Sequence, residues 1–424
     1  MKIYTVRRGD TVYLLARRFG LSAEEIIAAN RLQNPDVLSV GQALILPTEL
    51  VRHTVARGES VYAIAQAYQV TPETILAANP SIGSGARIYP GQVLQIPFPR
   101  ENLGTAAVNG YVTDTTAETL AYTLPYLTWL SPFSYRTDAA GELTPTYSVS
   151  TAEGAAYRTA NLLTVTNLKA QGGFSGDIAH AVLTDADVHQ RFLDRLFELL
   201  ARGNWYGVNL DFEYVYPFDR ESYNQFLRRL AERLHDRGYL LITALAPKTS
   251  REQAGLLYSA HDYAAHGAAA DYVVLMTYEW GYTYGPAMAV APINMVRRVL
   301  DYAVTEIPRQ KILMGVPNYG YDWTLPFVQG TAAKPLTNVA AVTLAGTVGA
   351  EIRFDATARS PYFNYTASDG KRHEVWFEDA RSLDAKYRLA AEYGLAGVSF
   401  WNLNRLFPAN FLVLSNLYAV EKVL

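Results

Sequence analysis

The chain has 424 residues, of which 50% are hydrophobic and 18% are charged, so it is long enough for two to four well-packed domains. A net charge of −3 and a pI near 6.2 argue against nucleic acid as the main partner. The absence of cysteine excludes disulfides and thiolate metal sites. The closest histidines, His261 and His266, are not spaced for one helical face, so we expect no metal and no cofactor.

The N-terminal residues lack the apolar core of a secretion signal, and no apolar run reaches membrane-spanning length. Either a leader has already been removed, or the protein reaches its substrate without the general secretion route. We expect neither a signal peptide nor membrane insertion, and we take a monomer as the working expectation.

The first hundred residues contain a repeat. The stretch YTVRRGDTVY at 4–13 recurs as HTVARGESVY at 53–62, and Gly41-Gln42 later aligns with Gly91-Gln92. Each unit predicts a strand, two helices and a strand. Oxygen-bearing side chains stand where the first helix of each unit begins, as helix N-termini require.

The two units resemble lysin-motif (LysM) domains, which bind N-acetylglucosamine-containing glycans such as peptidoglycan and chitin. The resemblance covers two small βααβ domains at residues 1–48 and 51–98. It implies a glycan groove between the first strand–helix loop and the loop before the last strand. Helix capping or core packing explains each groove residue, taken singly, equally well. The implied groove residues are Gly9, Asp10, Thr11, Val37 and Leu38 in the first unit and Gly58, Glu59, Ser60, Ile88 and Tyr89 in the second.

A short, proline-bearing linker at 97–104 should hold these units near the rest of the chain. From residue 104 to 424, apolar strand-like runs alternate with helix-like stretches such as 187–201 and 220–237, the pattern of βα units. Eight strands fit an α/β fold, the (β/α)8 TIM barrel. The predicted strands are 108–112, 126–131, 161–167, 206–213, 240–246, 271–278, 312–317 and 397–402.

An insertion is predicted at about 330–374, between the seventh and eighth strands. This stretch is too long for a simple loop and helix, and it holds strand-like runs at 351–354 and 374–377 around the turn signal Asp369-Gly370.

The fourth predicted strand, residues 206–213, carries the strongest functional signal. Its alternation places Asn209, Asp211 and Glu213 on one side and apolar residues on the other. Two carboxylates this close cannot both ionise easily, so one pKa should rise and leave a general acid beside an anionic partner. A structural carboxylate pair at a strand end is the alternative.

This segment resembles the signature of family 18 glycoside hydrolases, the chitinase-like (β/α)8 barrels. Their pattern Asp-x-x-Asp-x-Asp-x-Glu falls on Tyr206, Asn209, Asp211 and Glu213, and only the last two positions match. The resemblance implies substrate-assisted hydrolysis, in which Glu213 protonates the leaving oxygen. Asp211 would hold the sugar's 2-acetamido group while its carbonyl attacks the anomeric carbon. Asn209 can donate a hydrogen bond to Asp211 but cannot titrate, so we expect activity with an altered acid limb of the pH profile.

The insertion at about 330–374 resembles the small α+β insertion of some members of this family, and later strand ends resemble further family segments. Met276-Thr277-Tyr278-Glu279 is similar to Met-x-Tyr-Asp, which implies that Tyr278 hydrogen-bonds the acetamido carbonyl. Glu279 stands where the family has Asp, and Trp401 falls where the family places the indole under the reacting sugar. Aromatic faces suit pyranose rings, although core packing explains any single tryptophan as well. The other predicted substrate-binding residues are Trp280, Asn318 and Tyr319.

Both halves of the chain therefore imply β-linked N-acetylglucosamine as the ligand. LysM units ahead of a family 18 barrel resemble the spore cortex-lytic N-acetylglucosaminidases of spore-forming bacteria, which act in spore germination. The resemblance implies a retaining peptidoglycan hydrolase that cleaves β-1,4 bonds after N-acetylglucosamine and lies in the spore coat, the cortex or the cell wall. A chitinase with the same mechanism and a catalytically silent glycan-binding protein are the alternatives.

Overall fold

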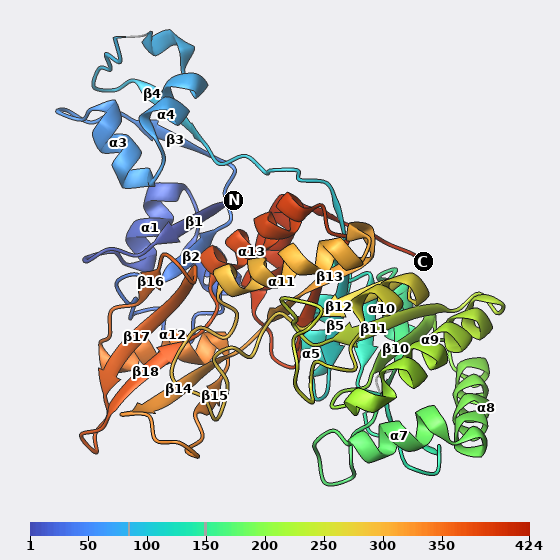
Figure 1. Ribbon diagram of the computed structural model, residues 1–424. Helices are drawn as coiled ribbons and strands as arrows, with labels where there is room; N and C mark the ends of the chain where they lie inside the picture. Colours follow the sequence, from blue (N-terminus) through green and yellow to red (C-terminus); the bar gives the residue numbers. More distant parts are fainter. Residues whose placement is uncertain (84, 148–150) are drawn as a thin grey trace.

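The computed structural model describes residues 1–83, 85–147 and 151–424 (Figure 1). Eight parallel strands form its centre, each hydrogen-bonded to the next in chain order, and the last pairs with the first, which closes a barrel. The predicted TIM barrel is confirmed, because each strand lies on a predicted run. The barrel strands are β5 (Thr105–Val112), β6 (Trp129–Pro132), β9 (Ala160–Thr166), β10 (Gly207–Asp211), β11 (Leu240–Leu245), β12 (Tyr272–Leu275), β13 (Ile312–Pro317) and β19 (Gly397–Trp401).

Helices follow the strands and cover the barrel. The long helix α8 shows why they pack there, since its apolar side chains recur at helical spacing and four of them are buried, from Phe192 to Leu200. Asp185 caps this helix by accepting bonds from two backbone N–H groups. The larger barrel helices are α5 (Ala117–Thr123), α7 (Gly176–Thr184), α8 (Ala186–Arg202), α9 (Arg220–His235), α10 (Tyr263–Ala269), α11 (Ile293–Glu306), α13 (Ala380–Tyr393) and α14 (Pro408–Leu417).

Short elements complete the barrel domain. They are η2 (Leu124–Tyr126), β7 (Tyr135–Thr137), β8 (Leu143–Pro145), α6 (Thr151–Ala156), η3 (Pro217–Asp219), η4 (Arg309–Lys311) and β20 (Ala419–Val420). Within the described residues, no helix combines the length and the apolar character needed to cross a bilayer.

The predicted insertion is an antiparallel sheet of five strands with one helix, and it lies on the opposite side of the barrel from α8 in Figure 1. The sheet begins at β14, before residue 330, because β14 pairs along its length with β18. The turn at Asp369-Gly370 joins β17 (Ser360–Thr366) to β18 (Arg372–Trp376), close to the predicted run at 374–377. The predicted run at 351–354 overlaps β16 (Arg353–Asp355), which pairs with β17, a strand that was not predicted. Its elements are β14 (Gly320–Leu325), β15 (Lys334–Leu336), α12 (Asn338–Val348), β16 (Arg353–Asp355), β17 (Ser360–Thr366) and β18 (Arg372–Trp376).

Both N-terminal units have the predicted strand–helix–helix–strand order. The side chains of Thr11 and Ser60 cap the first helix of each unit by accepting the backbone N–H of Leu14 and Ala63, both at 3.1 Å. The elements are β1 (Lys2–Thr5), α1 (Val12–Phe19), α2 (Ala23–Asn30) and β2 (Ala43–Leu46), then β3 (Leu50–Thr54), α3 (Val61–Tyr68), α4 (Pro72–Ala78), η1 (Pro80–Ile82) and β4 (Val93–Pro97).

The two units share one apolar core. The ring of Phe19 in the first unit contacts Tyr68 and Phe98 at centroid distances of 5.2 and 5.9 Å. The backbone of Thr5 exchanges two hydrogen bonds with the side chain of Gln69, at 3.0 and 2.7 Å. The units therefore form a single body.

The first unit also docks on the barrel domain. Ile45 on β2 is buried in the same apolar cluster as the barrel strands. The carbonyl of Val40 accepts a hydrogen bond of 2.9 Å from the backbone of Ile352, next to β16. Gly41 packs against the Ile352 carbonyl so closely that an added Cβ would lie 1.8 Å from its oxygen. The short linker and these contacts fix the N-terminal body on the insertion.

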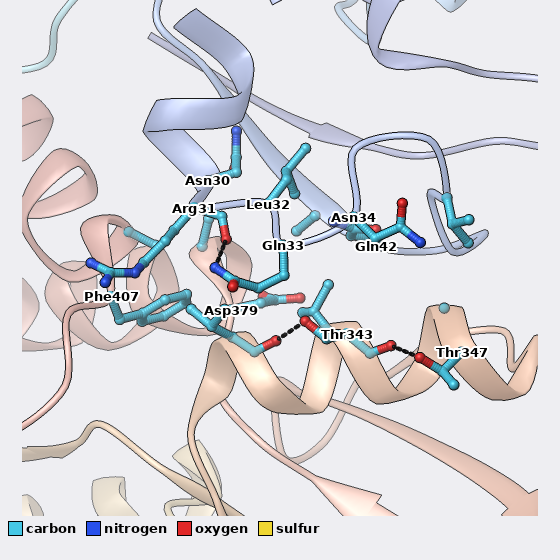
Figure 2. A pocket seen from close by; sticks show the side chains of 17 residues that line it. Asn30, Arg31, Leu32, Gln33, Asn34, Gln42, Thr343, Thr347, Asp379 and Phe407 are labelled. Atoms are coloured by element: carbon cyan, nitrogen blue, oxygen red, sulfur yellow. Dashed lines mark hydrogen bonds between the residues drawn. The ribbon is translucent and has the colours of Figure 1, made fainter. Parts of the chain in front are cut away.

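A pocket lies at this junction, between the first unit and α12 (Figure 2). Its volume is about 50 Å³, well below the roughly 300–1,000 Å³ of ligand sites. The hydroxyls of Thr343 and Thr347 bond to carbonyls of their own helix, and the Gln33 amide bonds to the Arg31 carbonyl. The pocket is therefore a gap between docked surfaces whose polar groups are largely satisfied.

Gly41→Ala should weaken this docking, because the new methyl group meets backbone rather than a side chain that can move. We expect a loss of roughly 1–3 kcal/mol in the free energy of unfolding and faster proteolysis at residues 97–104. The matched control is Gly91→Ala, at the same repeat position and with a similar φ of +83° against +82°, but with no atom within 4 Å. Equal losses in the two variants would contradict the docking role.

Candidate active site

Asp211 is the last residue of β10, and Glu213 follows it at the carboxyl end of the barrel. Asp211 is only 4% exposed, and its Oδ1 finds no hydrogen-bond partner among the described residues. Burial raises the pKa of Asp211 to about 7. Burial and then the charges of Asp211 and Glu279 raise the pKa of Glu213 well above its usual range. The two groups thus titrate as a coupled pair that keeps a proton near neutral pH.

The hydrogen-bond partners of Asn209 differ from the predicted one. Its amide donates to Ser131 Oγ at 3.0 Å, and its carbonyl accepts the hydroxyl of Tyr111 at 3.0 Å. The predicted hydrogen bond to Asp211 is therefore wrong. Strand residues two apart are separated by about 6.6 Å, and the Asn209 amide instead reaches across the barrel interior to β6 and β5, which do not pair with β10. Asn209 ties β10 to β6 and β5 beneath the carboxyl pair.

The backbone around Glu213 is held from both sides. The Asn167 side chain accepts the Glu213 N–H at 3.0 Å and donates to its carbonyl at 2.7 Å. His261 accepts the backbone N–H of Ala246 on Nδ1 at 2.9 Å, so its Nε2 carries the proton and donates to the Phe212 carbonyl at 3.0 Å. Burial lowers the pKa of His261 to about 4, which keeps this neutral form. Sequence reasoning missed both residues, because their role depends on contacts between loops.

Tyr278 and Glu279 come from the end of β12. Tyr278 is buried, and burial raises the pKa of its phenol well above the usual range, so it remains a proton donor. Glu279 has a left-handed backbone, with φ of +66°, which is uncommon outside glycine and places its side chain at the exposed mouth. The hydroxyls of Tyr319 and Tyr321 both donate to its carboxylate.

Of the predicted sugar contacts, Trp401 and Trp280 remain partly exposed, whereas Asn318 is buried. Trp401, at the end of β19, is half-buried and packs edgewise against Tyr111 and Phe133 at 5.6 and 5.2 Å. Trp280 is half-buried against the barrel core. Asn318 is buried, and it bonds to the carbonyls of Asn402 and Arg405 at 2.9 and 3.0 Å. We therefore reassign Asn318 from substrate binding to holding the loop after Trp401.

The polar groove residues of the N-terminal units are engaged internally. Asp10 accepts the Tyr4 hydroxyl at 2.9 Å and the backbone N–H of Arg7 at 2.8 Å. Glu59 makes the equivalent bonds with His53 at 2.8 Å and Ala56 at 2.7 Å. Gly9 and Gly58 have φ of +86° and +87° and open space where a side chain would stand. The side chains of Asp10 and Glu59 therefore shape these loops. Val37 lies against Gly346 of α12, and Leu38 and Ile88 pack on the N-terminal core, so backbone groups and the exposed Tyr89 are the groups most open to a glycan.

Across the described ranges, no group of three or more histidine, aspartate or glutamate side chains is placed to hold a metal ion. The arrangement that remains is a coupled carboxyl pair, a protonated phenol, a third carboxylate and an indole at strand ends. It suits acid catalysis on a sugar with an amide substituent.

Comparison with known proteins identifies the family of the chain. The model of glycosyl hydrolases family 18 matches residues 168–405, and the LysM domain model matches 4–47 and 53–97. The chain belongs to glycosyl hydrolase family 18 and is a glycosidase with two N-terminal LysM domains.

Among individual relatives, the cortical fragment-lytic enzyme of Bacillus subtilis (strain 168) is 43% identical over 100% of this chain and 99% of its own length. The crystal structure of the Bacillus megaterium QM B1551 spore cortex-lytic enzyme SleL is 37% identical, with a TM-score of 0.85 over 100% of this chain and 99% of that one. The Bacillus cereus SleL structure is 39% identical, with a TM-score of 0.84 over 99% and 98%.

Asn167→Ala should lower kcat by roughly 10–100-fold while KM changes little, because a loosened backbone misplaces the acid without removing a sugar contact. His261→Phe should act in the same direction. Steady-state kinetics on a soluble N-acetylglucosamine oligomer would measure both. Asn364→Ala is the control, since it removes an exposed amide of the insertion sheet that bonds to Glu374. A rise in KM with unchanged kcat would contradict the positioning role.

Glu279→Gln should move the alkaline limb of the kcat/KM profile to lower pH. It removes a negative charge that raises the pKa of Glu213, so the acid loses its proton earlier as the pH rises. We expect a shift on the order of half a unit to one unit. Tyr319→Phe keeps the charge of Glu279 and serves as the control. An unmoved limb in Glu279→Gln would show that this charge does not act on the acid.

Proposed function

We propose that this protein hydrolyses β-1,4 bonds after N-acetylglucosamine in fragments of spore-cortex peptidoglycan, with net retention of configuration. The observation that carries the proposal is the pairing of buried Asp211 with half-buried Glu213 at the end of β10, with the pKa of both groups raised. Full-length similarity to cortical fragment-lytic enzymes supports the choice of polymer.

The first chemical step uses both carboxyl groups. Glu213, kept protonated by its raised pKa, gives its proton to the leaving glycosidic oxygen. The free Oδ1 of Asp211 is a buried acceptor suited to the N–H of the 2-acetamido group, whose carbonyl oxygen attacks the anomeric carbon as the bond to the leaving sugar breaks. Desolvation makes the Asp211 charge effective in stabilising the cationic ring that forms.

The second step returns the enzyme to its starting state. The Glu213 carboxylate takes a proton from water, and the oxygen of that water attacks the anomeric carbon as the acetamido carbonyl leaves. Two displacements at one carbon give retention. In both steps we assign Tyr278 to donate a hydrogen bond to the acetamido carbonyl, and Trp401 to support the apolar face of the reacting sugar.

For partner and location, we propose that the LysM body binds peptidoglycan and keeps the enzyme associated with the spore. The support is the LysM match and the full-length similarity to spore enzymes. Because Ile45 is part of the barrel cluster, removal of the LysM body would expose barrel surface. Point variants such as Tyr89→Ala, at an exposed groove position, are therefore cleaner probes of binding.

Mass spectrometry of the products from purified spore cortex, with wild type and Glu213→Gln, tests the proposal. We expect fragments with reducing-end N-acetylglucosamine from wild type and at least a 100-fold slower release from the variant, about the effect of losing an acid catalyst.

Fragments ending in muramic acid would overturn the bond assignment. Activity on chitin oligomers without activity on cortex would favour the chitinase alternative. A chitinase structure from Chromobacterium violaceum, 30% identical over 73% of this chain, is the reason to include this substrate. Binding without products would favour the silent glycan-binding alternative.

A further inference from the structure

Aromatic side chains continue outward from the acid at alternate positions, Tyr214, Tyr216 and Phe218. Phe218 is 72% exposed and Tyr214 is 40% exposed. The left-handed backbone of Tyr214, with φ of +53°, turns the chain outward directly after Glu213. The ring of Tyr214 stacks on Phe174 at 6.4 Å, so an aromatic surface begins beside the acid.

The outer pair of rings is held in place. Tyr216 and Phe218 stack with a centroid distance of 5.1 Å and an interplanar angle of 23°. The Tyr216 hydroxyl donates to Asp177 at 2.7 Å, and His180 packs its edge on Phe218 at 5.7 Å while it contacts Asp219 at 2.9 Å. A side chain at Gly176 would lie 2.9 Å from the Tyr216 ring.

This organisation separates the pair from an ordinary exposed apolar side chain. Single exposed hydrophobic residues need no explanation. Here a 3₁₀ turn starting at Pro217, two side chains of α7 and a close glycine contact fix two rings. Rigid aromatic faces bind a flat apolar ligand surface with little loss of side-chain entropy.

We propose that Tyr216 and Phe218 form a sugar-binding platform for the glycan strand on the leaving-group side of the cleaved bond. The inference rests on the proposed function. Trp401, assigned to the reacting sugar, comes from β19, which lies four strands from β10 in the ring of eight and so across the barrel. The acid stands between that sugar and the leaving group, and the platform follows the acid in the loop after β10, where it packs on α7. The C–H face of a pyranose fits a stacked aromatic pair.

Phe218→Ala should raise KM for long glycan strands by roughly three- to tenfold, with kcat within twofold. The loss should be confined to substrates long enough to reach the platform and be absent for the shortest cleavable oligomer. Phe218→Trp should restore the wild-type KM. The matched control is Val328→Ala, which removes another exposed apolar side chain, 57% exposed, in the insertion.

Direct binding separates this proposal from the proposed function. The inactive variant Glu213→Gln is titrated with N-acetylglucosamine oligomers of increasing length, and its affinity should increase sharply at the length that reaches the platform. The double variant that also carries Phe218→Ala should lack this increase. This readout needs no turnover, so it holds even if cortex proves to be the wrong polymer. Three outcomes would overturn the platform. They are equal affinities for all oligomer lengths in both variants, an equal rise in KM for short and long substrates in Phe218→Ala, and self-association of the protein through Phe218.

Discussion

Asp211, which is buried, and Glu213, which is half-buried, stand two residues apart at the end of β10 and raise each other's cost of ionisation, and the structure around them depends on this constraint. Burial favours their protonated forms, so the folded state holds protons that the unfolded chain would release. Their contribution to stability therefore becomes less favourable as the pH rises from about 4 toward the Asp211 pKa of about 7. The barrel retains this unfavourable pair because its chemistry requires a proton donor at neutral pH.

The surroundings show how such a pair is kept in place. Below it, Asn209 connects three strands through Tyr111 and Ser131. Around it, Asn167 and His261 hold the backbone on both sides of the acid, and neither brings a charge that would lower its pKa. These neutral hydrogen bonds fix the position of the acid without neutralising it, which is the combination that general acid catalysis needs.

The N-terminal body is also held in a fixed position relative to the barrel. One core joins the two LysM domains, and contacts through Ile45 and Gly41 attach them to the barrel and the insertion. A glycan held by this body is therefore presented at a constant orientation to the catalytic domain. In a chain with a flexible tether, the modules would only raise the local concentration of substrate.

The sequence by itself determined the parts that rest on local pattern. Apolar runs that alternate with helix-like stretches predicted the eight strands, and the repeat predicted two strand–helix–helix–strand units, whose resemblance to LysM domains named them. Spacing placed Asp211 and Glu213 at a strand end. Only the tertiary structure decided the parts that rest on contacts between distant segments. Asn167 bonds to Glu213 from 46 residues away and His261 bonds to Phe212, just before it, from 49 residues away. The Asn209 amide bonds to Ser131 rather than to Asp211. The hydrogen-bonding range of a short side chain is a few ångströms in space, and the order of residues along a chain does not fix which segments come that close.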